Sequence, residues 1–479
     1  MKFLRIKPVD QLLTVDEERR LHRTLGALDL TLLGIGAIIG TGIFVLTGVG
    51  AAKAGPGVTL AFVVAGLACA FAALAYAELA AMVPVAGSAY TYSYAVLGEA
   101  LAWLVGWNLV LEYAVSAGAV AVGWSGYMVG ILSQVGIHIP EAWTTAYQKG
   151  GIMDAPAVLI SLFVTAMLVI GTKESATMNR VLVAIKIGVL VMFLVLVTPA
   201  VDPANWDPFL PFGWFEKKGF DENVGVFAAA AIVFFAYIGF DAVSCAAEET
   251  KNPNRDLPIG LIASLLICTV FYIAVAGVAT GAVPFTLLAN SKEPIALVLR
   301  ETGYQFGAAL LAVGAIAGIT TVLLVLIYGQ TRIFFAMSRD RLLPAWVGAV
   351  HPRFRTPHLI TIITGLFVAF VSGFFPLDKI AELSNIGTLF AFIAVAAGVM
   401  ILRVTQKYRK RPFRTPLVWV VGPLAILSCL GLILALPGDT WMRFLWWSLA
   451  GIVIYAFYGY RASPLHPRNG AGPSPGTGT

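Results

Sequence analysis

The sequence predicts an all-α integral membrane protein with about twelve transmembrane helices. Its composition is the first reason: hydrophobic residues make up 59% of 479 positions, and charged residues only 12%. So little charge does not cover the surface of a globular protein of this size. Recurring long apolar runs are the second reason, and two matching interruptions within such runs are the third.

The apolar runs are each long enough to cross about 30 Å of hydrocarbon. The third and eighth runs are longer than a bilayer requires, so we expect each to include a tilted or extramembrane turn. The predicted spans are 28–54, 58–83, 98–130, 153–172, 178–198, 224–250, 257–281, 305–336, 358–375, 379–402, 416–436 and 441–461.

The distribution of basic residues predicts the orientation. With twelve spans, most of the 32 Lys and Arg residues fall on the side of the two termini. The positive-inside rule then places both termini in the cytoplasm, in a multi-pass protein of the cytoplasmic (cell) membrane. This topology accounts for the net charge of +6 without a nucleic-acid partner. Residues 403–414 are interpreted as a positive-inside loop, with contact to anionic membrane lipid as the alternative.

The chain shows no pattern typical of an enzyme or a metal site. Its four cysteines lie in or beside apolar segments, where they are interpreted as small packing residues. HExxH, CxxC, Walker and GxSxG motifs are absent where a membrane enzyme would need them. We therefore expect neither catalytic residues nor a bound metal. The cysteines are Cys69, Cys245, Cys268 and Cys429.

Two apolar segments are interrupted at matching places in the two halves of the chain. Glycine destabilises a helix, and a broken helix is tolerated in a membrane where its freed backbone groups line a cavity or bind a ligand. Paired interruptions therefore predict the central substrate site of a transporter. The alternative is tight helix packing through small residues. The interruptions are Gly36-Ala37-Ile38-Ile39-Gly40-Thr41-Gly42-Ile43-Phe44 and Phe235-Ala236-Tyr237-Ile238-Gly239-Phe240-Asp241.

Such breaks suit the two charges of an amino acid. A restarting helix presents free N–H groups to a carboxylate, and a stopping helix presents free carbonyls to an ammonium. We expect Gly40, Thr41 and Gly42 to bind the carboxylate, with the Thr41 hydroxyl as a further donor. The remaining predicted substrate-binding positions, which include the carbonyls for the ammonium, are Ile38, Ile39, Phe235, Ala236 and Ile238.

Several motifs, in order, resemble the amino acid-polyamine-organocation (APC) superfamily, and in particular the cationic amino acid transporters and their bacterial homologues. The resemblance covers nearly all of residues 25–460. Besides the first interruption, it rests on Tyr76-Ala77-Glu78-Leu79-Ala80, Pro84-Val85-Ala86-Gly87-Ser88-Ala89-Tyr90-Thr91-Tyr92, Gly106-Trp107, Phe234-Phe235-Ala236-Tyr237-Ile238-Gly239-Phe240-Asp241, Glu248-Glu249-Thr250-Lys251-Asn252-Pro253 and Arg255-Asp256-Leu257-Pro258-Ile259-Gly260.

The resemblance implies a LeuT/APC-like fold of two inverted five-helix repeats, with helices 1 and 6 broken. A different multi-helix carrier fold is the alternative. The expected organisation is a cytoplasmic N-terminal segment at 1–26, a ten-helix transport core at 27–402, a cytoplasmic loop with two peripheral helices at 403–462, and a disordered tail at 463–479.

Lys186 is the one basic residue that is left inside a span when the basic residues near the span ends are assigned to the two sides of the membrane. Burial disfavours its charged form. In related sodium-coupled carriers a cation bridges the first helix to this part of the fold, and in proton-coupled relatives a lysine takes that place. The resemblance therefore implies that Lys186 couples transport to protons rather than to sodium. No cofactor is expected. The alternative is a permanently charged tether to backbone carbonyls.

Other polar and apolar positions complete the predicted site. Glu112 is expected either to pair with a cationic substrate side chain or to hydrogen-bond between helices. Leu326 and Ile327 are expected to limit long side chains, and Phe235 to act as a gate over bound substrate. Two further acids, Glu78 and Asp241, are interpreted as structural, and Tyr90 to Tyr94 as an aromatic belt at the membrane interface.

The predicted function is secondary active import of L-amino acids by proton symport, with small neutral, broad or cationic substrates. An exchanger using the same site is the alternative, ahead of a channel or receptor. The sequence makes no prediction about an accessory subunit.

Overall fold

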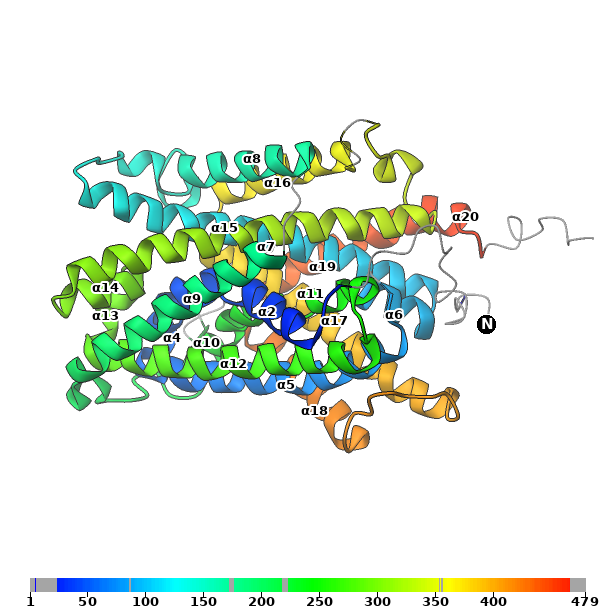
Figure 1. Cartoon of the computed structure of the whole chain (residues 1–479), viewed down its shortest axis with the longest axis horizontal. Helices are drawn as coiled ribbons and strands as arrows, with labels where there is room; N and C mark the ends of the chain where they lie inside the picture. Colours follow the sequence, from blue (N-terminus) through cyan, green and yellow to red (C-terminus); the bar gives the residue numbers. More distant parts are fainter. Residues whose placement is uncertain are drawn as a thin grey trace, which may run out of the picture.

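The computed structural model describes residues 5, 24–85, 88–171, 176–217, 223–352, 354 and 356–465. Long helices run beside one another along the longest axis of the molecule (Figure 1). The predicted N-terminal segment 1–26 and tail 463–479 lie largely outside the described residues.

The structure is helical almost throughout, as predicted. Eight of its described helical segments are long and apolar enough to cross a membrane, and three shorter apolar helices accompany them. The exception to the all-α prediction is a two-stranded antiparallel hairpin in which β1 (Glu216–Lys217) pairs with β2 (Asn223–Val224). The count of twelve spans and the two five-helix repeats remain predictions.

The principal α-helices follow one another in chain order, with short 3-10 and π-helical turns between some of them. They are α2 (Ala27–Ile38), α3 (Thr41–Phe44), α4 (Leu46–Ala54), α5 (Val58–Met82), α6 (Ser88–Val96), α7 (Glu99–Gln134), α8 (Ala155–Ile170), α9 (Ala176–Val197), α10 (Val226–Val233), α11 (Ala242–Cys245), α12 (Pro253–Ala282), α13 (Phe285–Ala289), α14 (Pro294–Glu301), α15 (Gln305–Arg339), α16 (His358–Phe374), α17 (Leu377–Thr405), α18 (Val418–Ala435), α19 (Gly438–Ile454) and α20 (Tyr460–Ala462).

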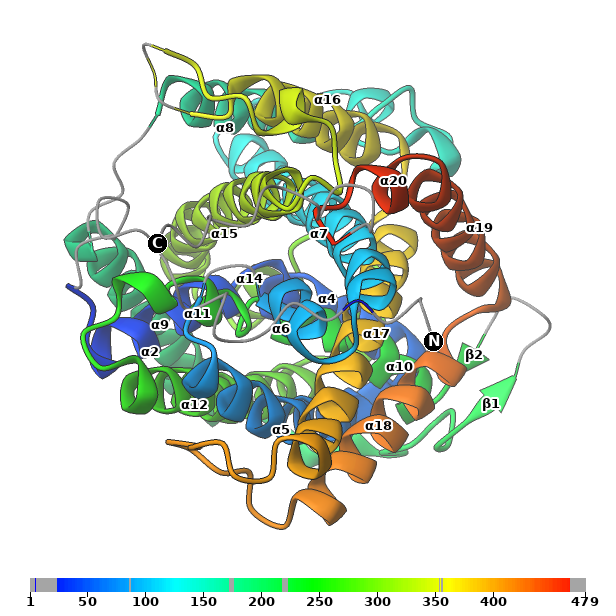
Figure 2. The same ribbon diagram turned by 90° about the vertical axis from the view of Figure 1, so that its right-hand side faces the viewer.

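The longest helices form the frame of the molecule. Helix α15 packs along α7, α12 packs along both α5 and α2, and α17 contacts α7 and α18. Figure 2 shows α8 and α16 together at one edge of the molecule and α18 and α19 at its periphery. At about 1.5 Å per residue, α7 and α15 exceed about 50 Å, so both extend beyond a hydrocarbon core of about 30 Å. They contain 36 and 35 residues.

The predicted aromatic belt at Tyr90 to Tyr94 is wrong. These tyrosines lie in α6, which packs against α7 and α17, and the rings of Tyr90 and Tyr94 are at most 2% exposed. The Tyr90 hydroxyl donates to Asp340 Oδ2 at 2.8 Å, and the Tyr94 hydroxyl donates to Glu99 Oε2 at 3.2 Å. Alternating tyrosines mark an interface only where their ring edges reach water, and here carboxylates satisfy the Tyr90 and Tyr94 hydroxyls inside the protein.

Glu78 on α5 holds the loop that follows α17. Its carboxylate accepts hydrogen bonds from Arg403 Nε at 2.8 Å and from the Thr415 backbone N–H at 2.8 Å. Arg411 Nε lies 3.2 Å from the same carboxylate as an ion pair. Because Glu78 is 1% exposed, these cationic and amide partners compensate for its desolvation.

Candidate functional site

The first interrupted segment breaks at the predicted place. Helix α2 ends at Ile38, Ile39 is in an extended conformation (φ −74°, ψ 102°), and α3 begins at Thr41 after Gly40. An α-helix offers no internal partner to the N–H groups of its first turn. The residues chosen for the carboxylate, Gly40, Thr41 and Gly42, therefore lie where backbone donors become available.

The second interrupted segment breaks in the same manner. Helix α10 ends at Val233, a 3-10 turn covers Phe234–Tyr237, and α11 starts at Ala242. Between these elements, Gly239 has φ +114°, a backbone conformation that residues other than glycine rarely adopt. Of the carbonyls chosen for the ammonium, those of Phe235, Ala236 and Ile238 lie in or next to this unwound stretch, and that of Ile38 lies at the end of α2, at the first break.

The two breaks lie directly against each other, although about 200 residues separate them in the chain. A Cβ atom on Gly42 would clash with the backbone of Ala236. A Cβ atom on Gly239 would lie 2.9 Å from the Ala37 carbonyl oxygen. Glycine is thus required at both positions by close backbone approach, and at Gly239 by its φ angle as well.

Tyr272 of α12 joins the two breaks, and the sequence analysis missed it. Its hydroxyl lies 2.8 Å from the Ile38 carbonyl oxygen and 2.9 Å from the Ala236 carbonyl oxygen. One hydroxyl carries one proton, so the two carbonyls share a single donor. A lone tyrosine inside an apolar helix needs a polar partner, and that is the signal from which it could have been noticed.

The side chains at the breaks are shielded from solvent. Thr41, Phe235 and Ile238 are 1%, 5% and 7% exposed, and Ile39 is fully buried. The Thr41 hydroxyl donates to the Val120 carbonyl of α7 at 3.4 Å, a long hydrogen bond. Its predicted contact with a substrate carboxylate remains a prediction, as does gating by Phe235.

Lys186 lies on α9 between two other helices. Its Nζ donates to the Gly36 carbonyl of α2 at 2.6 Å, one turn before the first break, and the side chain is 1% exposed. A Cβ atom on Gly318 of α15 would lie 2.8 Å from Lys186 Cε, so the lysine stem packs closely on that helix. The ammonium is therefore in direct contact with the helix that carries the first break.

Glu112 lies on α7 beside a second buried carboxylate, that of Asp241. Neither carboxylate oxygen of Glu112 has a hydrogen-bond partner among the described residues. Asp241, in contrast, accepts from the Ser88 hydroxyl at 3.2 Å and from the Tyr113 hydroxyl at 3.3 Å. These contacts agree with the interpretation of Asp241 as a structural residue. Glu112, in contrast, can accept a hydrogen bond from a ligand or take up a proton.

On α15, the residue that meets the first break is Val322. A Cβ atom on Gly40 would lie 3.0 Å from Val322 Cγ2. Leu326 follows one turn later on the same helix face, while Ile327 is offset by a further residue; both are buried. The sequence indicated this stretch of α15 but not Val322 in particular, because only the folded chain shows which face of α15 the break contacts.

Comparison with known proteins agrees with this geometry. A family model described as amino acid permease matches residues 25–460. The chain is 50% identical over 461 residues to a branched-chain amino acid permease of Bacillus subtilis, covering 95% of this chain and 97% of that protein. It is 46% identical over 467 residues to a methylthioribose transporter of Bacillus subtilis, covering 97% of this chain and 99% of that protein.

A more distant relative is the human cationic amino acid transporter 4. It is 36% identical over 410 residues, covering 84% of this chain and 62% of that protein. Since the family match spans nearly the whole helical region, the chain is a membrane transporter rather than an enzyme, and it belongs to the amino acid permease family of the APC superfamily.

Proposed function

We propose that this permease imports neutral aliphatic L-amino acids by proton symport, binding the substrate between its two broken segments. The observation that carries the proposal is the contact between the breaks. It brings the free N–H groups near Thr41 to one buried place with carbonyls near Ala236, whose oxygens can each accept a second hydrogen bond. The α-carboxylate and α-ammonium of an amino acid match these two sets of backbone groups.

The preference for aliphatic side chains has two supports. Val322 and Leu326 present an apolar surface on the face of α15 that meets the first break. The relative with 50% identity carries branched-chain amino acids by its name. A cationic substrate would instead place its charged end at Glu112, which lies beside Asp241 at the end of the second break.

Proton coupling is proposed for Lys186. Its ammonium donates to Gly36 on the helix that must move if the first break opens and closes. Loss of the proton would remove the charge from that hydrogen bond and weaken the link between α9 and α2. We also propose that both termini lie in the cytoplasm. The ion coupled to transport is then the proton and not sodium.

Uptake by purified protein in proteoliposomes tests the proposal. We expect labelled leucine, valine or alanine to accumulate above equilibrium under an inward proton gradient without sodium. Uptake that requires internal amino acid and ignores the gradient would establish the exchanger instead. Methylthioribose belongs among the competitors, because a relative of 46% identity transports it by name. If it alone competes, the amino acid proposal is wrong.

A further inference from the structure

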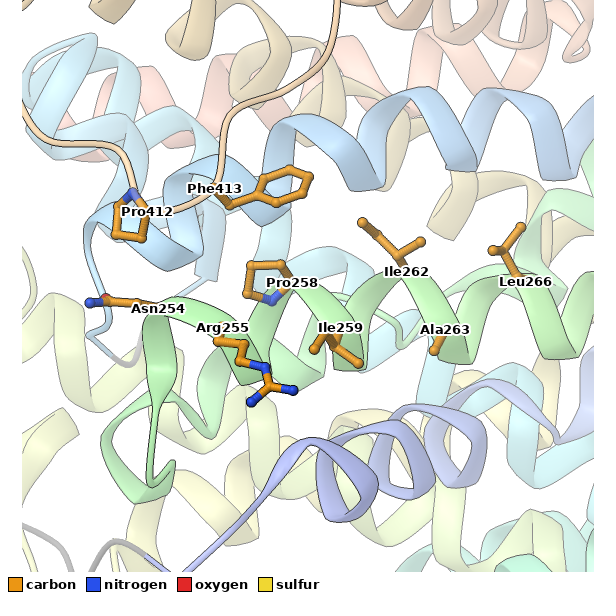
Figure 3. Close-up of a pocket in the computed structure, with 9 residues that line it drawn as sticks. All are labelled: Asn254, Arg255, Pro258, Ile259, Ile262, Ala263, Leu266, Pro412 and Phe413. Atoms are coloured by element: carbon orange, nitrogen blue, oxygen red, sulfur yellow. The ribbon is translucent and has the colours of Figure 1, made fainter.

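A groove lies on the outer face of α12, away from the two breaks. Its cavity volume is about 470 Å³, and Figure 3 shows Phe413, on the loop after α17, across from Pro258 of α12. Residues of α12 form one wall, and the loop forms the other. The lining residues are Asn254, Arg255, Pro258, Ile259, Ile262, Ala263, Leu266, Pro412 and Phe413.

Polar and apolar groups are separated along this groove. Asn254 and Arg255 lie in the first turn of α12, and apolar residues continue the same helix stripe to Leu266. The rise from Arg255 to Leu266 is about 16 Å. One leaflet of a bilayer contributes about half of a hydrocarbon core of about 30 Å, so the distance from Arg255 to the end of the apolar stripe matches the depth of one leaflet.

The groove opens towards lipid rather than towards the protein interior. Ile259 is 39% exposed and Leu266 is 55% exposed on a helix with a mean hydropathy of 2.5 over its most apolar stretch. The residues along the wall are bulky except for Ala263. A partner transmembrane helix packs best on small residues, so this wall suits a flexible acyl chain better than a second helix.

The charge at the polar end favours an anionic headgroup. Arg255 is exposed there, and two further exposed basic residues are close to the walls in sequence, Lys251 four positions before Arg255 and Arg414 directly after Phe413. The nearest acid in the first turn of α12, Asp256, is 6% exposed and does not line the groove. The positive end of the α12 dipole adds to the attraction for a phosphate.

The loop wall is held in place by buried interactions. Arg411 and Thr415, which flank Pro412 and Phe413, both contact the buried Glu78 carboxylate of α5. The groove is therefore preformed, and binding does not have to order its wall.

We propose that this groove binds one anionic glycerophospholipid, with its phosphate at Asn254 and Arg255 and one acyl chain along α12 to Leu266. The occupant is a lipid of the surrounding membrane, distinct from the transported substrate. Through this lipid, the anionic lipid content of the membrane would act on α12, the helix that carries Tyr272.

Native mass spectrometry of the whole purified protein with added phosphatidylglycerol tests this site. We expect a first phosphatidylglycerol to bind more tightly than later ones and more tightly than phosphatidylcholine. Arg255→Gln should weaken that first binding about fivefold, since one basic residue near a headgroup contributes on that scale. Ala263→Phe, which fills the acyl path, should remove it. The control is Arg332→Gln, at an exposed arginine outside the groove.

Size-exclusion profiles and melting curves establish that each variant is folded. Equal loss from Arg255→Gln and Arg332→Gln would show general attraction to a basic surface and overturn the proposal. Unchanged binding in Ala263→Phe would overturn it as well, and so would equal affinity for phosphatidylcholine. A polypeptide cross-linked through Leu266→Cys would also overturn it. Because the readout is lipid binding, the result is independent of whether amino acid transport is confirmed.

Discussion

Replacing Tyr272 with phenylalanine tests whether one hydroxyl holds the two breaks together. The ring remains, while the Ile38 and Ala236 carbonyls lose the donor at 2.8 and 2.9 Å. Each carbonyl oxygen accepts two hydrogen bonds, so the hydroxyl and a substrate ammonium can share these oxygens. Removing the hydroxyl therefore leaves the two breaks less firmly held together. It does not free a position that the substrate ammonium needs.

The expected effect follows from the value of one hydrogen bond. Leaving a buried acceptor without its partner costs about 1–3 kcal/mol, and the two carbonyls share one proton, so we count one bond. A loss of about 1.4 kcal/mol in substrate binding corresponds to an affinity about tenfold weaker. Isothermal titration calorimetry with leucine or alanine measures this change directly.

Tyr90→Phe is the matched control. Tyr90 is also buried, and its hydroxyl donates at 2.8 Å to Asp340 Oδ2, and neither residue is part of a break. Both variants should melt at lower temperature by similar amounts, and only Tyr272→Phe should bind substrate more weakly. If both variants keep normal affinity, or both lose it equally, the Tyr272 hydroxyl does not organise the site.

Three further substitutions test the site. Gly42→Val should abolish amino acid binding in folded protein, because the new side chain would clash with Ala236. The control Gly188→Val, with open space around it, should bind normally in calorimetry, and normal binding in Gly42→Val would remove Gly42 from the site. Lys186→Ala should lose accumulation driven by an inward proton gradient while exchange of labelled substrate survives, and gradient-driven accumulation by this variant would place the proton elsewhere. Phe235→Ala should release bound labelled substrate several times faster in a filter assay, and an unchanged release rate would contradict a gate at this ring.

The positions of the breaks were predictable because glycine acts locally. A residue without a Cβ weakens its own helix wherever the chain leads, so Gly40 and Gly239 marked the interruptions before any packing was known. The position of Lys186 inside a span was predictable for a similar reason, since a charge in a long apolar run is visible without the fold. Its link to the first helix was implied only through the resemblance to a family, and Gly36 as its partner was not predicted.

Contacts between distant segments were decided by the tertiary structure. The sequence by itself determined a helical membrane protein, its interrupted segments and its family resemblance, because hydropathy and helix breaking are properties of neighbouring residues. It did not determine that Tyr272 meets Ile38, that Val322 faces Gly40, or that Tyr90 is buried against Asp340. These depend on how helices rotate and pack against one another, and an apolar helix in lipid has little periodicity to show which face turns inward.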